Sequence, residues 1–208
     1  MPRTMEPGDA PSGNLLLPVL PLREICLFPE ASLTLVTAAA PALRAVEVAQ
    51  RTGGRLLAVC TKDEGTRETH AVGTIAQLAE DLALSEGGHR VELDGQRRAR
   101  VVTLMGMDPW VAEATPLPEG DPGDDWGPAV EALARYLHAH ADLRSFLDQQ
   151  RRSKEPMAWV NLACQHLPIA ATARQKLLDA DAPERCVKIS RGLDALLRKE
   201  QGAWSSGI

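Results

Sequence analysis

The chain has 208 residues, enough for one domain of ordinary size or for two small domains that share an interface. Hydrophobic residues make up 44% and charged residues 25%, which excludes wholesale disorder, while an aromatic content of 3% leaves Leu, Val and Ala to fill the core. The net charge of −5 and the pI near 5.6 argue against a nucleic-acid-binding class, because such domains usually carry a basic face.

The cysteines are widely spaced and form no CxxC pair, which predicts reduced, mostly buried thiols and no disulfide framework. The longest apolar runs are far shorter than the roughly 20 residues of a membrane span, and the first residues contain no apolar signal segment. We therefore expect a cytoplasmic protein that does not enter a membrane.

Residues 1–14 are rich in Pro, Gly and small polar residues, so we expect a disordered tail. Between residues 15 and 36 two apolar runs follow, and the prolines at 18, 21 and 29 exclude a helix through them. The sequence predicts two extended strands at a sheet edge, joined by a loop over residues 23–30.

Residues 39–54 change to a helical period, in which Leu43, Val46 and Ala49 share a face and two glycines supply a stop. Short segments with strand-like alternation follow, each bounded by Gly, Pro or Asp, at 55–61, 70–84, 89–95, 96–107 and 110–117. A β-rich lobe is therefore expected over residues 15–117, built as a curved sheet or pseudo-barrel with one inserted helix.

Residues 118–127 are rich in Pro, Gly and Asp and predict a linker, after which residues 128–200 predict an all-helical bundle of about four helices and residues 201–208 a tail. The expected helix starts are Asp125 with Pro128, Ser153 with Pro156, the segment ATARQKLLDA, and Pro183 with Asp181 as the cap. The fold class is thus α+β.

Motifs for catalysis are missing. The chain contains no GxxxxGK[ST] loop and no GxSxG frame. Three pairs of reactive residues stand two apart on predicted helices, where side chains point to different sides: Lys188 and Ser190, Cys164 and His166, His138 and His140. We expect no catalytic residue, no metal site and no cofactor.

One dense basic cluster, Arg97, Arg98 and Arg100, lies on a predicted strand with its members on alternating faces. A solvated strand with ion pairs to Asp94 or Glu92 is the favoured interpretation, because no aromatic residues are interleaved and the chain is acidic. An RNA- or nucleotide-binding domain that uses these three arginines is the alternative.

The loop after the first strand is unusual because it holds large apolar residues between two prolines. These residues either form an interior plug of the β lobe or line an apolar cleft between the lobes that accepts extended polypeptide. Both interpretations stay open, and under the second the candidate contacts are Ile25, Leu27, Phe28 and Pro29.

Four segments, in order, resemble the amino-terminal substrate-binding domain of the ATP-dependent Lon proteases. LPVLPLREICLFPE (17–30) is similar to the family's opening pattern, HAVGTIAQL (70–78) to a strand with VGT, VELDGQRRARV (91–101) to a hairpin with spaced arginines, and LPIAATARQKLLDADAPERC (167–186) to a helical segment. Two places depart from the family pattern: Glu30 after the FP pair, and TLVTAAAPALRA (34–45) before the first helix.

The resemblance implies a PUA-like β lobe followed by a helical lobe, a role in recognising unfolded or tagged client proteins, and no catalytic residue in this region. In Lon an ATPase and a peptidase follow this domain, whereas this sequence ends at Ile208. We therefore expect a stand-alone, non-catalytic binding module whose further candidate partners are a separate protease or a second copy of the chain.

Overall fold

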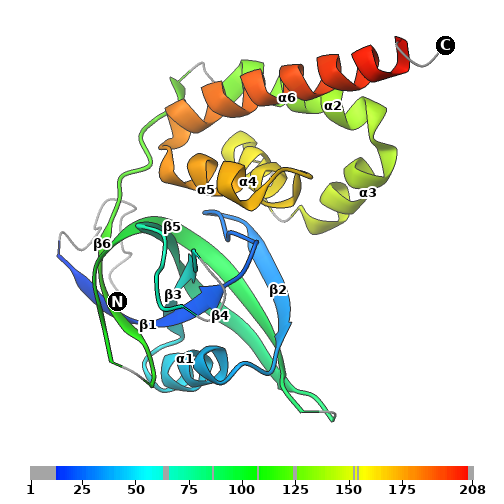
Figure 1. The fold of residues 1–208 in the computed structure, drawn as a ribbon. Helices are drawn as coiled ribbons and strands as arrows, with labels where there is room; N and C mark the ends of the chain where they lie inside the picture. Colours follow the sequence, from blue (N-terminus) through cyan, green and yellow to red (C-terminus); the bar gives the residue numbers. More distant parts are fainter. Residues whose placement is uncertain are drawn as a thin grey trace, which may run out of the picture.

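Five strands close into a small barrel in the computed structural model, which describes residues 13–62, 66–85, 87–106, 108–123, 126–151, 153 and 155–205. β1 (Leu15–Leu22) pairs with β3 (Arg55–Cys60) and β6 (Val111–Pro116), β4 (Val72–Ala83) with β3, and β5 (His89–Met105) with both β4 and β6. The pairings form a complete cycle, so the expected curved sheet is a closed barrel (Figure 1).

The barrel strands separate two cores because alternate side chains of a strand face opposite sides of the sheet. Leu57 and Val59 of β3 point into the barrel, where they pack in a cluster with Trp110. Leu56 and Ala58, from the same strand, belong to a larger cluster outside the barrel. β3 is therefore buried on both faces, which explains its continuous apolar run RLLAVC.

β5 is one continuous strand of 17 residues, although the sequence predicted two strands that meet near residue 95. Its first half pairs with β2 (Ser32–Thr37) and its second half with β6, and register shifts in its pairing with β4 and β6 bend it between these partners. Gly95 is not a turn: a Cβ at this position would overlap the carbonyl oxygen of Phe28. The glycine permits a close approach of two backbones.

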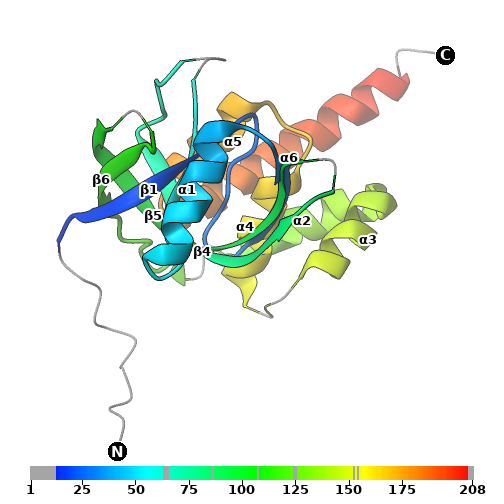
Figure 2. The ribbon, with the colours of Figure 1, turned by 90° about the horizontal axis from the view of Figure 1, so that it is seen from below.

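α1 (Ala40–Arg51) forms where the helical period predicted it, and Gly53 and Gly54 follow it with positive φ. One face of the helix is buried, and it includes Ala42, Ala45 and Val46. It covers the side of the barrel opposite the helical lobe (Figure 2).

The described part of the second lobe has five helices, whereas the sequence predicted about four: α2 (Trp126–Ala139), α3 (Ala141–Gln150), α4 (Pro156–His166), α5 (Ala171–Asp179) and α6 (Ala182–Ser205). The additional helix is α3, which buries only Leu147 and therefore has little apolar periodicity. α6 continues to Ser205, five residues past the expected end, because an internal glycine weakens a helix without ending it.

The ends of the lobes agree only partly with the expected boundaries. Asn14 is not in a free tail, since its side chain hydrogen-bonds to Glu113 and Thr115 at 2.6 Å each. Asp181 caps α6 as predicted, accepting a hydrogen bond from the Glu184 N–H at 3.0 Å. The predicted cap Asp125, most of the predicted first tail and residues 206–208 lie outside the described residues.

The two lobes share one hydrophobic core. The larger cluster contains Leu27, Phe28 and Leu93 from the β lobe together with Leu133 and Leu162 from the helices. Because apolar side chains from both lobes lose their contact with water together, we expect the lobes to unfold cooperatively.

The two phenylalanines of the chain provide a matched test of this core. Phe28 is 0% exposed and Phe146 is 41% exposed. Phe28→Ala should lower the free energy of unfolding by about 3–5 kcal/mol because it leaves a cavity between the lobes, whereas Phe146→Ala should lower it by less than about 1 kcal/mol. Denaturant unfolding measures both; equal effects would contradict the shared core.

Candidate functional site

The apolar loop after β1 lies in the core rather than on the surface. Leu27 is 1% and Phe28 0% exposed, and Pro29 is also buried. These three predicted contact residues therefore do not line an open surface in this structure, and the loop has the placement of the interior plug. Its apolar composition follows from its position between the two lobes.

Backbone hydrogen bonds to polar side chains fix this loop from both lobes. The Thr74 hydroxyl of β4 donates to the Leu27 carbonyl at 2.5 Å. The Gln165 side chain of α4 accepts from the Phe28 N–H at 3.1 Å and donates to the Ser32 carbonyl at 2.7 Å. Buried loop backbone needs such partners, because an unpaired buried amide costs free energy comparable to a lost hydrogen bond.

Two non-glycine residues with left-handed backbone frame the loop. Glu24 has φ 58° and Glu30 has φ 59°, a conformation that costs an L-residue roughly 1–2 kcal/mol. The surroundings hold both: Arg174 donates to the Glu24 carbonyl at 2.6 Å, and the Glu30 N–H donates to the Gly95 carbonyl at 2.8 Å. The strained conformation thus persists because contacts from α5 and β5 determine it.

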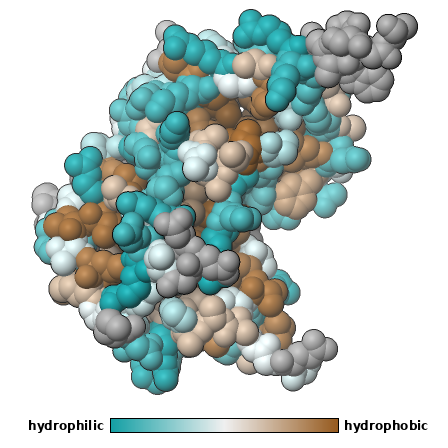
Figure 3. Space-filling model, in the orientation of Figure 1, coloured by the Kyte–Doolittle hydropathy of each residue, from teal (hydrophilic) through white to brown (hydrophobic). Residues whose placement is uncertain are grey.

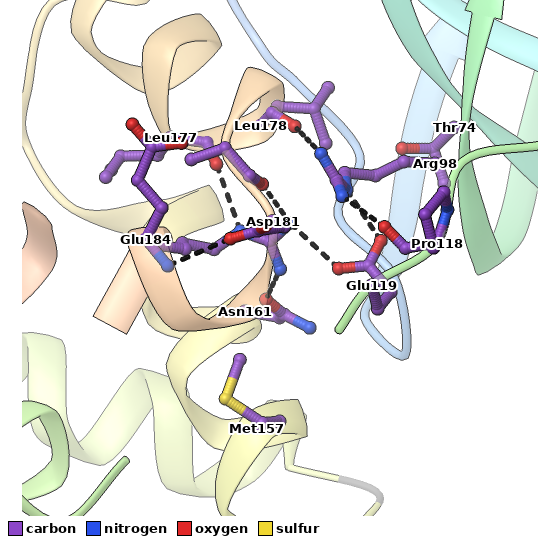
Figure 4. Close-up of polar contacts among 12 residues, drawn as sticks. Thr74, Arg98, Pro118, Glu119, Met157, Asn161, Leu177, Leu178, Asp181 and Glu184 are labelled. Carbon is purple, nitrogen blue, oxygen red and sulfur yellow. Dashed lines mark hydrogen bonds and ion pairs between the residues drawn. The ribbon is translucent and has the colours of Figure 1, made fainter. Parts of the chain in front are cut away.

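Of the three arginines proposed for nucleic acid, Arg98 is buried and serves the fold. It is 3% exposed, pairs with Glu119 at 2.7 Å, and donates to the carbonyls of Pro118 at 2.7 Å and Asp179 at 3.0 Å (Figure 4). Its partner is Glu119 rather than Asp94 or Glu92, because β5 turns its side chain toward the helical lobe. Arg97 is half-buried and Arg100 exposed, so the three arginines do not form one basic surface.

Glu119 joins Arg98 to a second buried arginine on α6. Arg185 is 0% exposed and donates to Glu119 at 3.1 Å, to the Asn161 side chain at 2.6 Å, and to two backbone carbonyls. Its guanidinium also lies 5.5 Å from the centre of the Phe28 ring. One carboxylate therefore links β5 of the barrel to α6 of the helical lobe.

The open apolar surface lies on the β lobe, in a groove of about 520 Å³. It is bordered by the end of β1, the start of the buried loop, the end of β2 and the start of α1. Of the described residues that line it, Arg23 is the one charged side chain; the rest are Pro21, Leu22, Ile25, Leu35, Val36, Thr37, Ala38, Ala39, Pro41, Ala42, Thr61, Thr66 and Trp110. We call this surface the β2 groove.

Between the lobes the space is much smaller. A pocket lined by Ala31, Ser32, Arg151 and Leu162, among others, has a volume of about 10 Å³, room for roughly one water molecule. Figure 3 shows the surface hollowed between the helical lobe and the lower right of the β lobe, with apolar residues along β2. The β2 groove is thus the larger of these two pockets and has the more apolar lining.

Ile25 is the one predicted contact residue that borders the β2 groove, where it is partly exposed. The sequence analysis missed Val36, which is 69% exposed on β2, and the small residues that lead into α1. The sequence feature that could have indicated these residues is an apolar run that lacks the periodicity of a buried face, as in TLVTAAAP.

The described residues show neither a metal cluster nor a membrane helix. No group of three or more His, Cys, Asp or Glu side chains among them is placed to hold a metal ion. Likewise, none of the helices in the described part of the chain has the length and apolar character that a membrane crossing requires.

The barrel with its helical lobe has the fold of Lon amino-terminal domains. The N-terminal domain of Mycobacterium avium complex Lon protease superposes with a TM-score of 0.72 at 19% identity over 86% of this chain and 98% of that one. The Lon N-terminal domain protein from Xanthomonas campestris gives 0.58 at 22% identity, over 84% and 95%. These likenesses confirm the predicted α+β fold class and show that the fold is that of Lon amino-terminal domains.

The chain belongs to the ATP-dependent protease La (LON) substrate-binding domain family, whose model matches residues 16–194. Lon protease 2 of Desulfotalea psychrophila is 26% identical over 80% of this chain, and Lon protease of Desulfovibrio desulfuricans 32% identical over 61%. The chain spans 23% and 15% of these two proteins, so the similarity concerns their substrate-binding domain.

The role of the Glu119 carboxylate can be tested with two glutamates that each join two arginines. Glu119 joins Arg98 and Arg185, which are buried, whereas Glu47 joins Arg44 and Arg51, which are exposed. Glu119→Gln should cost about 2–4 kcal/mol of unfolding free energy because it leaves buried guanidinium charge uncompensated, and Glu47→Gln less than about 1 kcal/mol. Urea unfolding of both variants decides this, and a Glu119→Gln variant as stable as the parent would refute the role.

Proposed function

We propose that this chain is a non-catalytic recognition module that binds an extended, apolar segment of an unfolded or tagged polypeptide in the β2 groove. The observation that carries the proposal is an apolar groove that runs beside the unpaired edge of β2. Among the described strands, β2 pairs with β5 alone and stands at the end of the sheet order. An open strand edge beside apolar surface is the arrangement that accepts a further strand.

Backbone geometry supports this mode of binding. The Ser32 carbonyl points away from β5, since it accepts a hydrogen bond from Gln165. Thr37 is an odd-numbered residue of β2, unlike Ser32, and its carbonyl points toward β5. It lies against Gly88, which precedes His89, the residue that pairs with Thr37. Because backbone groups two residues apart point the same way, Thr34 and Val36 present their N–H and C=O groups along the open edge.

The groove also suits apolar side chains of a bound strand. Leu35 and Ile25 are partly buried and supply an apolar wall, and Val36 adds exposed apolar area on β2. With one charged residue in the described lining, an apolar segment would desolvate few ionic groups on entry. Nucleic acid finds no corresponding basic surface here, because the chain is acidic and Arg98 is buried.

Two exposed apolar residues on different strands allow a matched test of the groove. Val36→Asp on β2 should weaken binding of a fluorescently labelled peptide of alternating leucine and serine by about tenfold or more, because it places a charge on the apolar edge. Leu16→Asp on β1 should leave it unchanged, since Leu16 is 67% exposed and does not line the groove. Fluorescence anisotropy measures both dissociation constants; equal losses for the two variants would reject the groove as the site.

The strand-addition mode has its own test. Two versions of the same peptide carry N-methyl groups on alternate backbone nitrogens, one on odd and one on even positions. A methyl group should weaken binding only where it replaces an N–H that donates a hydrogen bond to β2. One version of the peptide should therefore lose binding, whereas the other should keep it. Equal binding by both versions would show that side chains alone are recognised.

A place in ATP-dependent proteolysis is the wider form of the proposal. The curated relatives are Lon proteases, and this chain matches their substrate-binding domain. We expect the bound polypeptide to be passed to a protease that carries the ATPase and peptidase activities. Copurification of such a protease with the parent chain, lost on competition with an excess of the apolar peptide, would support a shared substrate path.

A further inference from the structure

Two of the four cysteines lie in contact in the larger core, although they are 34 residues apart in the sequence. The Sγ atoms of Cys26 and Cys60 are 3.3 Å apart. Cys26 belongs to the buried loop and Cys60 ends β3, and they are 1% and 7% exposed. A disulfide needs an Sγ–Sγ distance of about 2.05 Å, so a shift of roughly 1.3 Å would bring the two sulfurs into bonding distance.

We propose that Cys26 and Cys60 are a modification site at which hydrogen peroxide forms a reversible disulfide. The Cys26 thiolate attacks one peroxide oxygen, the O–O bond breaks, and the released hydroxide takes a proton to become water. The resulting Cys26 sulfenic acid is then attacked by the Cys60 sulfur, which forms the S–S bond and releases a second water. In sum, two thiols are oxidised by two electrons and one peroxide is reduced to two waters.

The surroundings assign different roles to the two thiols. The pKa of the Cys26 thiol is lowered because Cys60 hydrogen-bonds to it and the Arg174 guanidinium adds positive charge nearby, although burial opposes both effects. The pKa of Cys60 is raised by the same hydrogen bond and by burial. The Cys60 thiol also donates to the Ile25 carbonyl at 2.8 Å, which holds its proton in place, so Cys26 is the thiol that becomes the nucleophile and Cys60 the thiol that resolves the sulfenic acid.

The β2 groove brings a small oxidant close to this pair. Ile25 and Thr61 line the groove and are sequence neighbours of Cys26 and Cys60, and Leu22, which also lines it, pairs with Cys60 between β1 and β3. The Cys60 thiol also lies 2.8 Å from the Ile25 carbonyl, so the pair sits directly behind the groove wall. Peroxide is about the size of two water molecules joined, so it needs little opening to reach Cys60.

The other two cysteines provide an internal comparison. Cys164 and Cys186 are both 0% exposed, and the Cys186 sulfur contacts the Met157 sulfur at 3.4 Å. Burial raises the pKa of the Cys164 thiol to about 12, which keeps it protonated and unreactive. Oxidation should therefore be selective for Cys26 and Cys60.

The test is mass spectrometry of the full chain after a short treatment with equimolar hydrogen peroxide, followed by denaturation, alkylation and tryptic digestion. We expect two of the four thiols to resist alkylation, a mass decrease of about 2 Da before alkylation, and a cross-link between peptides 24–44 and 56–62 that dithiothreitol removes. The oxidised chain should melt at a temperature higher by something on the order of 5–10 °C, because the bond closes a loop of this length.

Variants separate the roles. Cys60→Ser should stop the reaction at a sulfenic acid on Cys26 that dimedone traps, and the double variant Cys164→Ser, Cys186→Ser should still form the cross-link. Should Cys60→Ser fail to fold, the cross-link map of the parent chain decides alone. Four alkylatable thiols after treatment, or sulfinic acid on Cys26 without a cross-link, would overturn the proposal, whatever the outcome of the peptide-binding experiments.

Discussion

The arrangement of the two lobes depends on one carboxylate between two buried guanidinium groups. Glu119 lies in the segment after β6, where the chain leaves the barrel. It pairs with Arg98 of β5 and Arg185 of α6. Buried charges are tolerated only when paired and hydrogen-bonded, and here backbone carbonyls and Asn161 satisfy the remaining donors named above. Such directional contacts restrict the angle between the lobes more than apolar packing alone, and at this junction the Arg185 guanidinium also lies 5.5 Å from the centre of the Phe28 ring.

The sequence predicted most of the elements but few of the contacts between them. Elements with a clear local apolar pattern were predicted within a few residues, as with the continuous apolar run of β3 and the helical period of α1, because this pattern reflects which side chains are buried. α3 was missed since it buries one residue, and Gly95 was taken as a turn because its constraint comes from the distant Phe28 carbonyl. The burial of Arg98 was not predictable either, since its partner lies outside its own strand and depends on how the lobes meet.

The segments that carry the Lon resemblance contain several of the residues that form the junction between the lobes. Phe28, Arg98 and Arg185 lie in three of the four segments, and Thr74, which holds the buried loop, lies in the other. The resemblance therefore reports how the lobes are joined. Half of the described residues that line the β2 groove lie within 34–45, the stretch that departs from the family pattern. If this chain and its relatives bind different polypeptides, they would be expected to share a scaffold and to differ in the groove.

The rigidity of the buried loop has a consequence for the groove in front of it. Hydrogen bonds from α4, α5, β4 and β5 hold the backbone of this loop. The part of the groove wall that Ile25 forms is therefore already ordered before a polypeptide binds. Preorganised surface reduces the entropy cost of association, which matters most for an unfolded partner that must itself be ordered. In the proposed binding mode, the β2 edge would pair with the backbone common to all polypeptides, and the groove beside it would select for apolar side chains.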